Sequence, residues 1–91
     1  MKSNNSIKQK VTEVTTLPKD VILGTPLLSV TGYNELNLEN HIGIIEYTET
    51  LIRIRTKTGL IKIKGLKLEI ELYTNDEIRL TGTINSIEFH H

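Results

Sequence analysis

Apolar and polar residues alternate with a period of two along most of the chain after Leu27. The alternation runs through residues 28–31, 35–39, 52–55, 61–64, 66–73 and 78–81. Successive side chains of a strand point to opposite faces, so this pattern predicts antiparallel strands with one buried and one solvated face. The gaps between the runs are too short for the crossover helices that a parallel sheet requires. The sequence therefore predicts an all-β fold.

We expect a single curled antiparallel meander of about seven or eight short strands, with a roll, a small sandwich and an open barrel as the alternative architectures. Three segments share an apolar-x-apolar-x-Gly pattern and end at Gly32, Gly65 and Gly82. These glycines are expected at sharp corners or bulges that let the sheet curl over itself. The central residues of the dry layer are expected to be Ile52, Ile54, Ile61, Ile63, Leu68 and Ile70.

The register of the strands follows from the requirement that the apolar side chains share one face. Turns are expected at residues 56–59, at Gly65 and at Asn75, with Gly59 in the left-handed conformation. The expected cross-strand pairs are Arg53 with Lys62, Arg55 with Leu60, Lys62 with Glu69, Tyr73 with Glu77 and Glu71 with Arg79. Two of these pairs join opposite charges on the wet face, which favours the register.

The amino-terminal part of the chain differs from the rest. Residues 1–16 are polar with isolated apolar positions, and we expect a flexible arm. Residues 17–91 are expected to form a single β domain that begins with a short helical turn. Pro18 suits the first position of that turn, Gly24 its left-handed end, and Pro26 prevents continuation.

Composition limits the classes of function. The 91 residues contain no cysteine, which fits a reducing cytosol, and 11 basic residues balance 11 acidic ones. No apolar run approaches the roughly 20 residues of a membrane span, and no secretory signal is expected. The balanced charge and the absence of basic patches with interleaved aromatic residues argue against nucleic-acid binding.

Charge is unevenly distributed, however, and residues 53–67 carry six Lys or Arg and no acid. Five of these residues define a candidate docking surface, which we call the basic face: Arg53, Arg55, Lys57, Lys62 and Lys64. One interpretation is a solvated face that Glu69 and Glu71 partly neutralise. The other is an electrostatic docking surface for an acidic partner or an anionic lipid.

Catalytic chemistry is not indicated. His41, His90 and His91 do not form a metal-ligand spacing with a third ligand, and the carboxylates stand singly at alternate strand positions. There is no phosphate-binding loop, dinucleotide fingerprint or nucleophile elbow. The sequence predicts no catalytic, cofactor-binding or metal-binding residues, and no enzyme.

An ordered series of short segments resembles the YabP/YqfC family of sporulation proteins. The segments are Leu17 to Leu23, Pro26, Val30-Thr31-Gly32, Glu35 to His41, Thr58-Gly59, Ile61 to Gly65 and Leu80-Thr81-Gly82. The resemblance covers roughly residues 17 to 89, and the Leu-Pro-Lys-Asp opening is nearer to the YqfC branch. Asn40 and His41 also match the family pattern, and we interpret them as a turn device rather than a site.

The resemblance implies a protein of Gram-positive endospore formers that is made in the mother cell and is needed for spore development. In such a family, a small protein of this kind is typically encoded beside a membrane protein. Our leading hypothesis is a non-enzymatic cytoplasmic adaptor that acts with a sporulation membrane protein, peripherally at the membrane. The alternative is a structural spore-layer protein that forms homo-oligomers through its edge strands.

Overall fold

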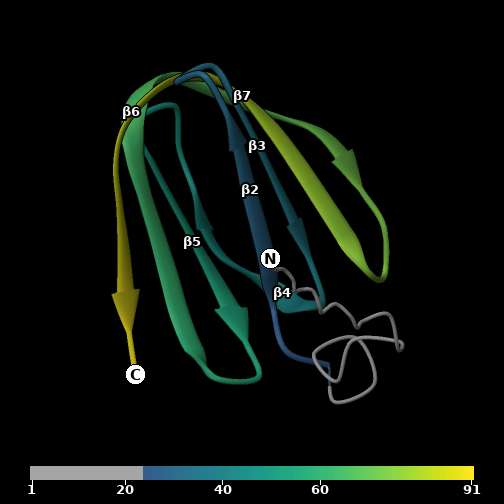
Figure 1. The fold of residues 1–91 in the computed structure, drawn as a ribbon. Helices are drawn as coiled ribbons and strands as arrows, with labels where there is room; N and C mark the ends of the chain where they lie inside the picture. Colours follow the sequence, from purple (N-terminus) through teal and green to yellow (C-terminus); the bar gives the residue numbers. More distant parts are fainter. Residues whose placement is uncertain (1–23) are drawn as a thin grey trace, which may run out of the picture.

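The computed structural model describes residues 24–91, and every helix or strand assigned in this part of the chain is a β-strand (Figure 1). The strands are β2 (Leu27–Thr31), β3 (Glu35–Glu39), β4 (His41–Tyr47), β5 (Leu51–Thr56), β6 (Gly59–Tyr73) and β7 (Glu77–His90). They form one antiparallel sheet with the order β2-β3-β7-β6-β5-β4. The all-β prediction is confirmed for the described residues, in which β6 and β7 are longer than the short strands expected.

The two longest strands give the sheet its curl. β6 has 15 residues and β7 has 14, and both arch over the same corner (Figure 1). On one side of this corner, residues 69–73 and 77–81 form a first layer with β3 and β2. On the other side, residues 60–66 and 83–90 form a second layer with β5 and β4. Among the expected architectures, this folded sheet is nearest to a small sandwich.

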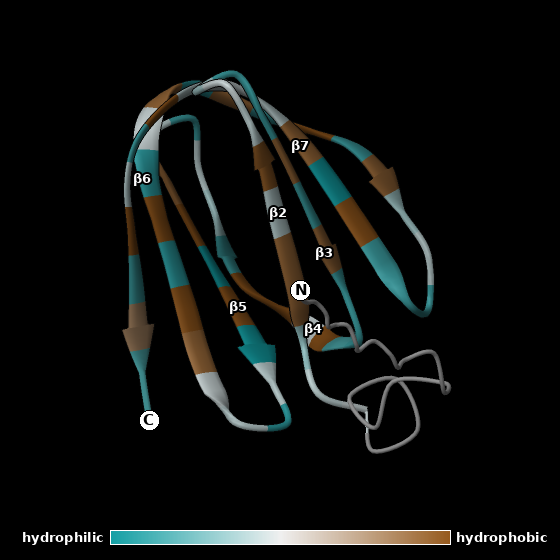
Figure 2. Cartoon of the chain, in the orientation of Figure 1, coloured by the Kyte–Doolittle hydropathy of each residue, from teal (hydrophilic) through white to brown (hydrophobic). Residues whose placement is uncertain are grey.

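The dry layer predicted from the alternation lies between the two layers of the sheet. The buried apolar side chains are Leu36, Leu38, Ile78 and Leu80 from the first layer, Ile52, Ile54, Ile61 and Ile63 from the second, and Leu68 from the corner. Figure 2 shows the underlying alternation as brown and teal bands along β6 and β7. Five of the six predicted core residues are buried, and the sixth, Ile70, is half-buried and packs against them.

Gly65 and Gly82 lie at the corner, where they permit close contact between β6 and β7. A Cβ atom at Gly65 would overlap the carbonyl oxygen of Thr83, and one at Gly82 would lie 2.6 Å from the carbonyl oxygen of Lys67. Register shifts interrupt the β6–β7 pairing on both sides of residues 65–66. The prediction of glycines at corners or bulges is confirmed for Gly65 and Gly82, whereas Gly32 lies in the turn between β2 and β3. β6 and β7 continue through Gly65 and Gly82, so that part of the chain forms two long strands rather than several short ones.

The predicted registers have different outcomes. The β5–β6 pairs Arg53–Lys62 and Arg55–Leu60 are confirmed. The turn expected at Gly65 is wrong, because β6 passes through it and Lys62 pairs with Glu88 rather than with Glu69. In the hairpin at Asn75 a bulge leaves Glu71 without a partner across the ladder. Arg79 therefore pairs with Leu72, and Tyr73 with Ile78.

The connection from β3 to β4 departs from a simple meander. β4 to β7 follow one another across the sheet, but β3 lies beside β7 and β4 forms the opposite edge. Asn40 makes this crossover with a left-handed φ of 67°, and its side-chain amide donates a 2.8 Å hydrogen bond to the carbonyl of Thr25. The ring of His41 is buried, and its Nε2 lies 2.7 Å from the carbonyl oxygen of Thr74. Asn40 therefore acts as the predicted turn residue, whereas His41 contacts the β6–β7 turn instead.

The predicted arm over residues 1–16 and the helical turn over residues 17–23 lie outside the described residues. Gly24, which was expected to end that turn, has a positive φ of 78°.

Candidate docking surface

Four residues of the basic face project from the outer side of the second layer. Arg53 and Arg55 alternate with the buried Ile52 and Ile54 of β5, and Lys62 and Lys64 alternate with buried residues of β6. The register sets Arg53 directly beside Lys62. The sequence was therefore right about which strands carry these side chains.

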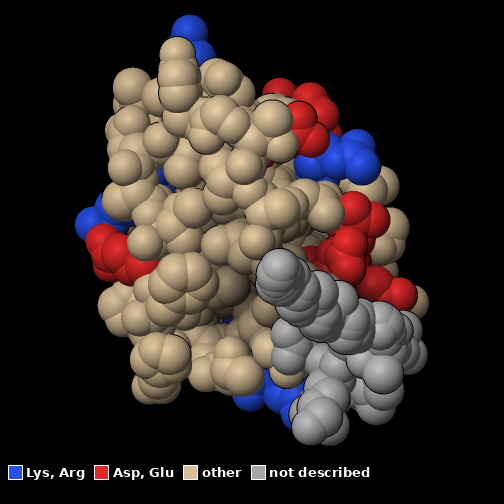
Figure 3. Space-filling model, viewed as in Figure 1, with Lys and Arg blue, Asp and Glu red and all other residues tan. Residues whose placement is uncertain are grey.

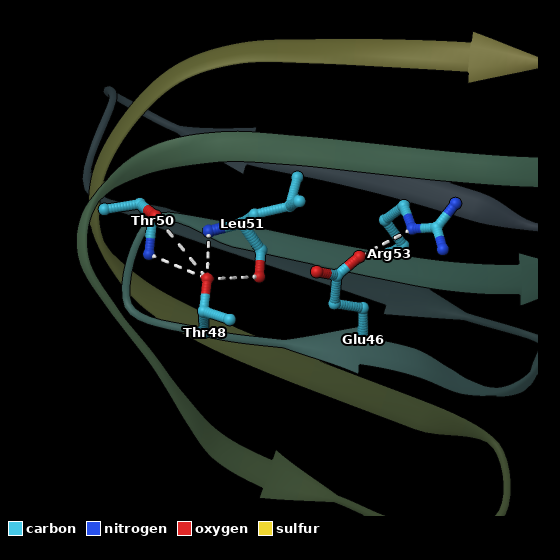
Figure 4. Close-up of polar contacts among 5 residues, drawn as sticks. All are labelled: Glu46, Thr48, Thr50, Leu51 and Arg53. Carbon is cyan, nitrogen blue, oxygen red and sulfur yellow. Dashed lines mark hydrogen bonds and ion pairs between the residues drawn. The ribbon is translucent and has the colours of Figure 1, made fainter.

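Acidic residues from the flanking strands complete this row. Glu46 of β4 pairs with Arg53, and Glu88 of β7 pairs with Lys62, so the order across the sheet is acid, base, base, acid. Arg53 Nε lies 2.9 Å from Glu46 Oε1 (Figure 4). Lys64 Nζ lies 3.5 Å from Glu88 Oε2. The expectation that Glu69 and Glu71 neutralise the face was wrong, because Glu46 and Glu88 form these ion pairs.

Glu88 also contacts His90, whose Nε2 lies 3.3 Å from Glu88 Oε1. This hydrogen bond and the positive charges of Lys64 and Lys62 hold the pKa of the Glu88 carboxyl below its ordinary value. The lowered pKa favours the ionised carboxylate, which offsets part of the basic charge.

The next row of the same face has an apolar centre. Leu60 of β6 lies between Arg55 of β5 and His90 of β7 in the register. Arg53, Leu60, Lys62 and His90 line a hollow of about 140 Å³. Gly43, the partner of Arg55 on β4, adds no side chain to the row. The face thus combines a half-buried leucine with three nitrogen-bearing side chains around it.

The other three predicted residues of the basic face, Arg55, Lys57 and Lys64, lie away from its central row. Arg55 and Lys64 are exposed, and Lys57 lies in the two-residue turn between β5 and β6. That turn is held by the Thr56 hydroxyl, which donates to the carbonyl of Gly59 at 3.0 Å. Lys57 lies beside Gly24 rather than over the centre of the face.

Four contributors were absent from the candidate set drawn from the sequence: Glu88, His90, Leu60 and Glu46. The register expected around Asn75 could have identified Glu88. If the pairing of the two strands is extended beyond Gly65 and Gly82, it sets Lys62 opposite Glu88, as in the structure. The signal was present, but the turn expected at Gly65 concealed it.

Other hollows carry different residues. One of about 190 Å³ opens between the two layers and is lined largely by Pro26, Leu28, Leu60, Ile61 and Phe89, with polar groups from Thr and His residues. Another lies at the corner beside Tyr47, Glu49, Lys67, Leu68 and Glu69. Within residues 24–91, no three His, Asp or Glu side chains are grouped to hold a metal ion. The same part of the chain has no helix with the length and apolar character of a membrane span.

Charged side chains are concentrated at the margins of the molecular face in Figure 3, and its centre is uncharged. At two of these margins, basic and acidic side chains lie next to each other (Figure 3). On the face shown, charge of both signs is therefore mixed locally, with no broad basic surface.

Comparison with known proteins gives two matches. The model of the YabP family matches residues 24–91. The chain is also 29% identical over 85 residues to an uncharacterized protein, YqfC, of Bacillus subtilis (strain 168), and this similarity covers 93% of the chain and 91% of that protein. No solved structure gives a significant match.

Proposed function

Since the chain belongs to the YabP family, which suggests a sporulation-related protein, we propose that it is a non-enzymatic adaptor in spore development. In this proposal the basic face docks on an acidic region of a membrane protein in the mother cell. The adaptor is cytoplasmic and reaches the membrane through that partner. The membrane partner and the mother-cell location come from the resemblance stated above.

The observation that carries the proposal is the composition of the basic face. Arg53, Lys62 and His90 surround the half-buried Leu60, and Glu46 and Glu88 from the neighbouring strands flank the row of Arg53 and Lys62. Ordered charge of both signs favours selective docking over general attraction, because a wrong partner meets like charges.

The test is capture of partners from sporulating cells of an endospore former. Tagged wild-type protein is compared with a double variant, Arg55→Glu with Lys62→Glu, and with Lys67→Glu, a charge reversal outside the basic face. We expect the wild type and Lys67→Glu to retain the same membrane protein and the double variant to lose it. Recovery of no membrane protein by the wild type, or equal recovery by all three, would contradict the proposal.

A second candidate function is edge-to-edge self-assembly, and β2 favours it. This strand has five residues without charge, pairs with β3 without a bulge, and leaves Val30 42% exposed. No described strand pairs with its outer edge. Natural sheets usually protect such edges with charges or bulges, as β4 does with two register shifts. Light scattering across a concentration series tests this candidate, and a monomer at every concentration would exclude it.

A further inference from the structure

We propose that the hollow around Leu60 is a binding site for a carboxylate that stands next to an apolar side chain, in an acidic peptide segment of a partner protein. The hollow is formed by Arg53, Leu60, Lys62 and His90 and has a volume of about 140 Å³. This proposal rests on the adaptor function, and it adds the chemical class of the bound segment and the residues that recognise it.

The first argument is the supply of hydrogen-bond donors. The Nε of Arg53 donates its hydrogen bond to Glu46. Figure 4 shows that the two terminal nitrogens of the guanidinium point away from Glu46. No described residue forms an ion pair with Lys62, although Glu88 is its partner in the register. Both cations thus retain donors for an incoming carboxylate, and a charge-assisted bond to Arg is among the stronger polar contacts.

The second argument is that the neighbouring carboxylates hold two side chains of the hollow, Arg53 and His90, in place. The ion pair with Glu46 holds the guanidinium of Arg53, whose side chain is only 37% exposed. Glu88 contacts both Lys64 and His90 on the other side of the hollow. Side chains that are already ordered lose less conformational entropy when a ligand binds.

The third argument is the apolar centre. Leu60 is half-buried on the outer face, and the register sets Arg55 and His90 on its two sides. An inorganic anion would gain nothing from this leucine, whereas an apolar side chain next to the carboxylate would bury area against it. The pairing of an apolar floor with a cationic rim therefore fits a segment in which acidic and apolar residues are neighbours.

A peptide fits this site better than an anionic membrane surface. Polybasic lipid-binding segments carry about 4–8 clustered cations, whereas Glu46 and Glu88 flank Arg53 and Lys62 here and offset their charge. A flat anionic surface would bring its charge against both carboxylates at once. A peptide carboxylate can enter between them, at Arg53 and Lys62.

The experiment uses the full chain, labelled for nuclear magnetic resonance. The probe is an acetylated and amidated peptide of alternating glutamate and leucine, with the glutamine counterpart as its control. We expect the glutamate peptide to shift the methyl signals of Leu60 and the side-chain signals of Arg53, and the glutamine peptide to leave them unchanged. Lys62→Glu should weaken binding by at least about tenfold, because it sets a like charge against the ligand. Lys67→Glu, the same exchange outside the basic face, should change the affinity by less than about twofold.

Three results would overturn the inference: no shift at Leu60 or Arg53 at millimolar peptide, equal weakening by Lys62→Glu and Lys67→Glu, or equal binding of the glutamine peptide. Vesicles of neutral phospholipid with and without phosphatidylglycerol form a parallel arm. If the protein binds the anionic vesicles but not the peptide, the ligand of this site is a lipid surface and the proposal is wrong. If wild type and Lys62→Glu capture the same membrane protein equally well from cells, the adaptor function stands and this site is wrong.

Discussion

The hydroxyl of Tyr47 on β4 accepts a 3.0 Å hydrogen bond from the backbone amide of Ile70 on β6. These residues lie in different layers of the folded sheet, and β4 and β6 are not neighbours in the strand order. Backbone bonds reinforce the same junction, because the amides of Gly65 and Leu68 donate to the carbonyls of Thr50 and Glu49 in the β4–β5 turn. The Tyr47 side chain thus adds to the backbone hydrogen bonds that join the two layers along one side of the sandwich.

Tyr47→Phe removes only the hydroxyl from this junction. Because the amide of Ile70 then loses its acceptor, we expect the free energy of unfolding to fall by about 0.5–1.5 kcal/mol. Urea denaturation followed by circular dichroism measures this change. Tyr33→Phe is the matched control, since Tyr33 is 64% exposed and no hydrogen bond of its hydroxyl is found among the described residues. Equal effects of the two variants would show that Tyr47 does not hold the layers together.

Asn40 combines two roles at the β3–β4 crossover, and two variants separate them. Asn40→Gly retains the freedom to adopt the φ of 67° but loses the hydrogen bond to Thr25. Asn40→Ala loses the bond and also places a Cβ in the left-handed region, which costs about 1–2 kcal/mol more. We therefore expect Asn40→Ala to be the less stable variant in denaturant titrations. The reverse order would mean that the backbone conformation is not a constraint here.

Ile63 and Arg55 test the assignment of the two faces. Ile63 is fully buried, so Ile63→Asp places a carboxylate among apolar side chains and should leave the protein unfolded. Arg55 is exposed and forms no ion pair with a described residue, so Arg55→Ala should change the free energy of unfolding by less than about 0.5 kcal/mol. Amide dispersion in a two-dimensional spectrum distinguishes folded from unfolded protein, and similar spectra for both variants would refute the assignment.

The alternation of side chains was sufficient to predict the fold class, most of the core and the β5–β6 register. These features are local, because a two-residue turn joins β5 to β6 and fixes the pairing of Arg55 with Leu60. The basic residues of the candidate site followed from the same hairpin. Pattern reasoning succeeds where neighbouring strands are also neighbours in sequence.

Reasoning from the alternation failed at the corner where the sheet bends. The alternation predicts that Leu66 and Leu68 both point inward, but a register shift follows Leu66, so Leu68 is buried whereas Leu66 stays on the outer face and is 55% exposed. Whether Gly65 ends a strand or bends it depends on contacts with Thr83, which is distant in sequence. The same ambiguity hid Glu88 and His90 from the candidate site, because their place beside β6 exists only when both strands continue through the corner.

Glu88 makes the outer face sensitive to acid. Its pKa is lowered by the hydrogen bond from His90 and by the charges of Lys64 and Lys62. A lowered pKa in the folded state means that the unfolded chain takes up the proton first as the pH falls. The contribution of Glu88 to stability is therefore present above the ordinary glutamate pKa and is lost as the pH falls through the lowered value.

A carbon-detected titration of the glutamate side chains measures this shift directly. We expect Glu88 to titrate below a freely exposed glutamate, and His90→Ala to move its midpoint back toward the ordinary value, because the hydrogen bond is the largest cause. Arg79→Gln, which removes a charge from the other layer, serves as the control and should leave the midpoint in place. An ordinary glutamate pKa for Glu88 in the wild type would show that its contacts with Lys64 and His90 do not form in solution.

Gly65 and Gly43 are both strand glycines, yet they should respond oppositely to the same substitution. A Cβ at Gly65 would meet the backbone carbonyl of Thr83, so Gly65→Ala forces β6 and β7 apart and should cost about 1–3 kcal/mol. At Gly43 no atom lies within 4 Å of the added carbon and φ is not positive. Gly43→Ala should therefore be neutral or stabilising by up to about 1 kcal/mol, because it restricts the unfolded chain. Thermal and urea unfolding of both variants compare them, and a tolerated alanine at Gly65 would show that the corner does not need the close approach of its two strands.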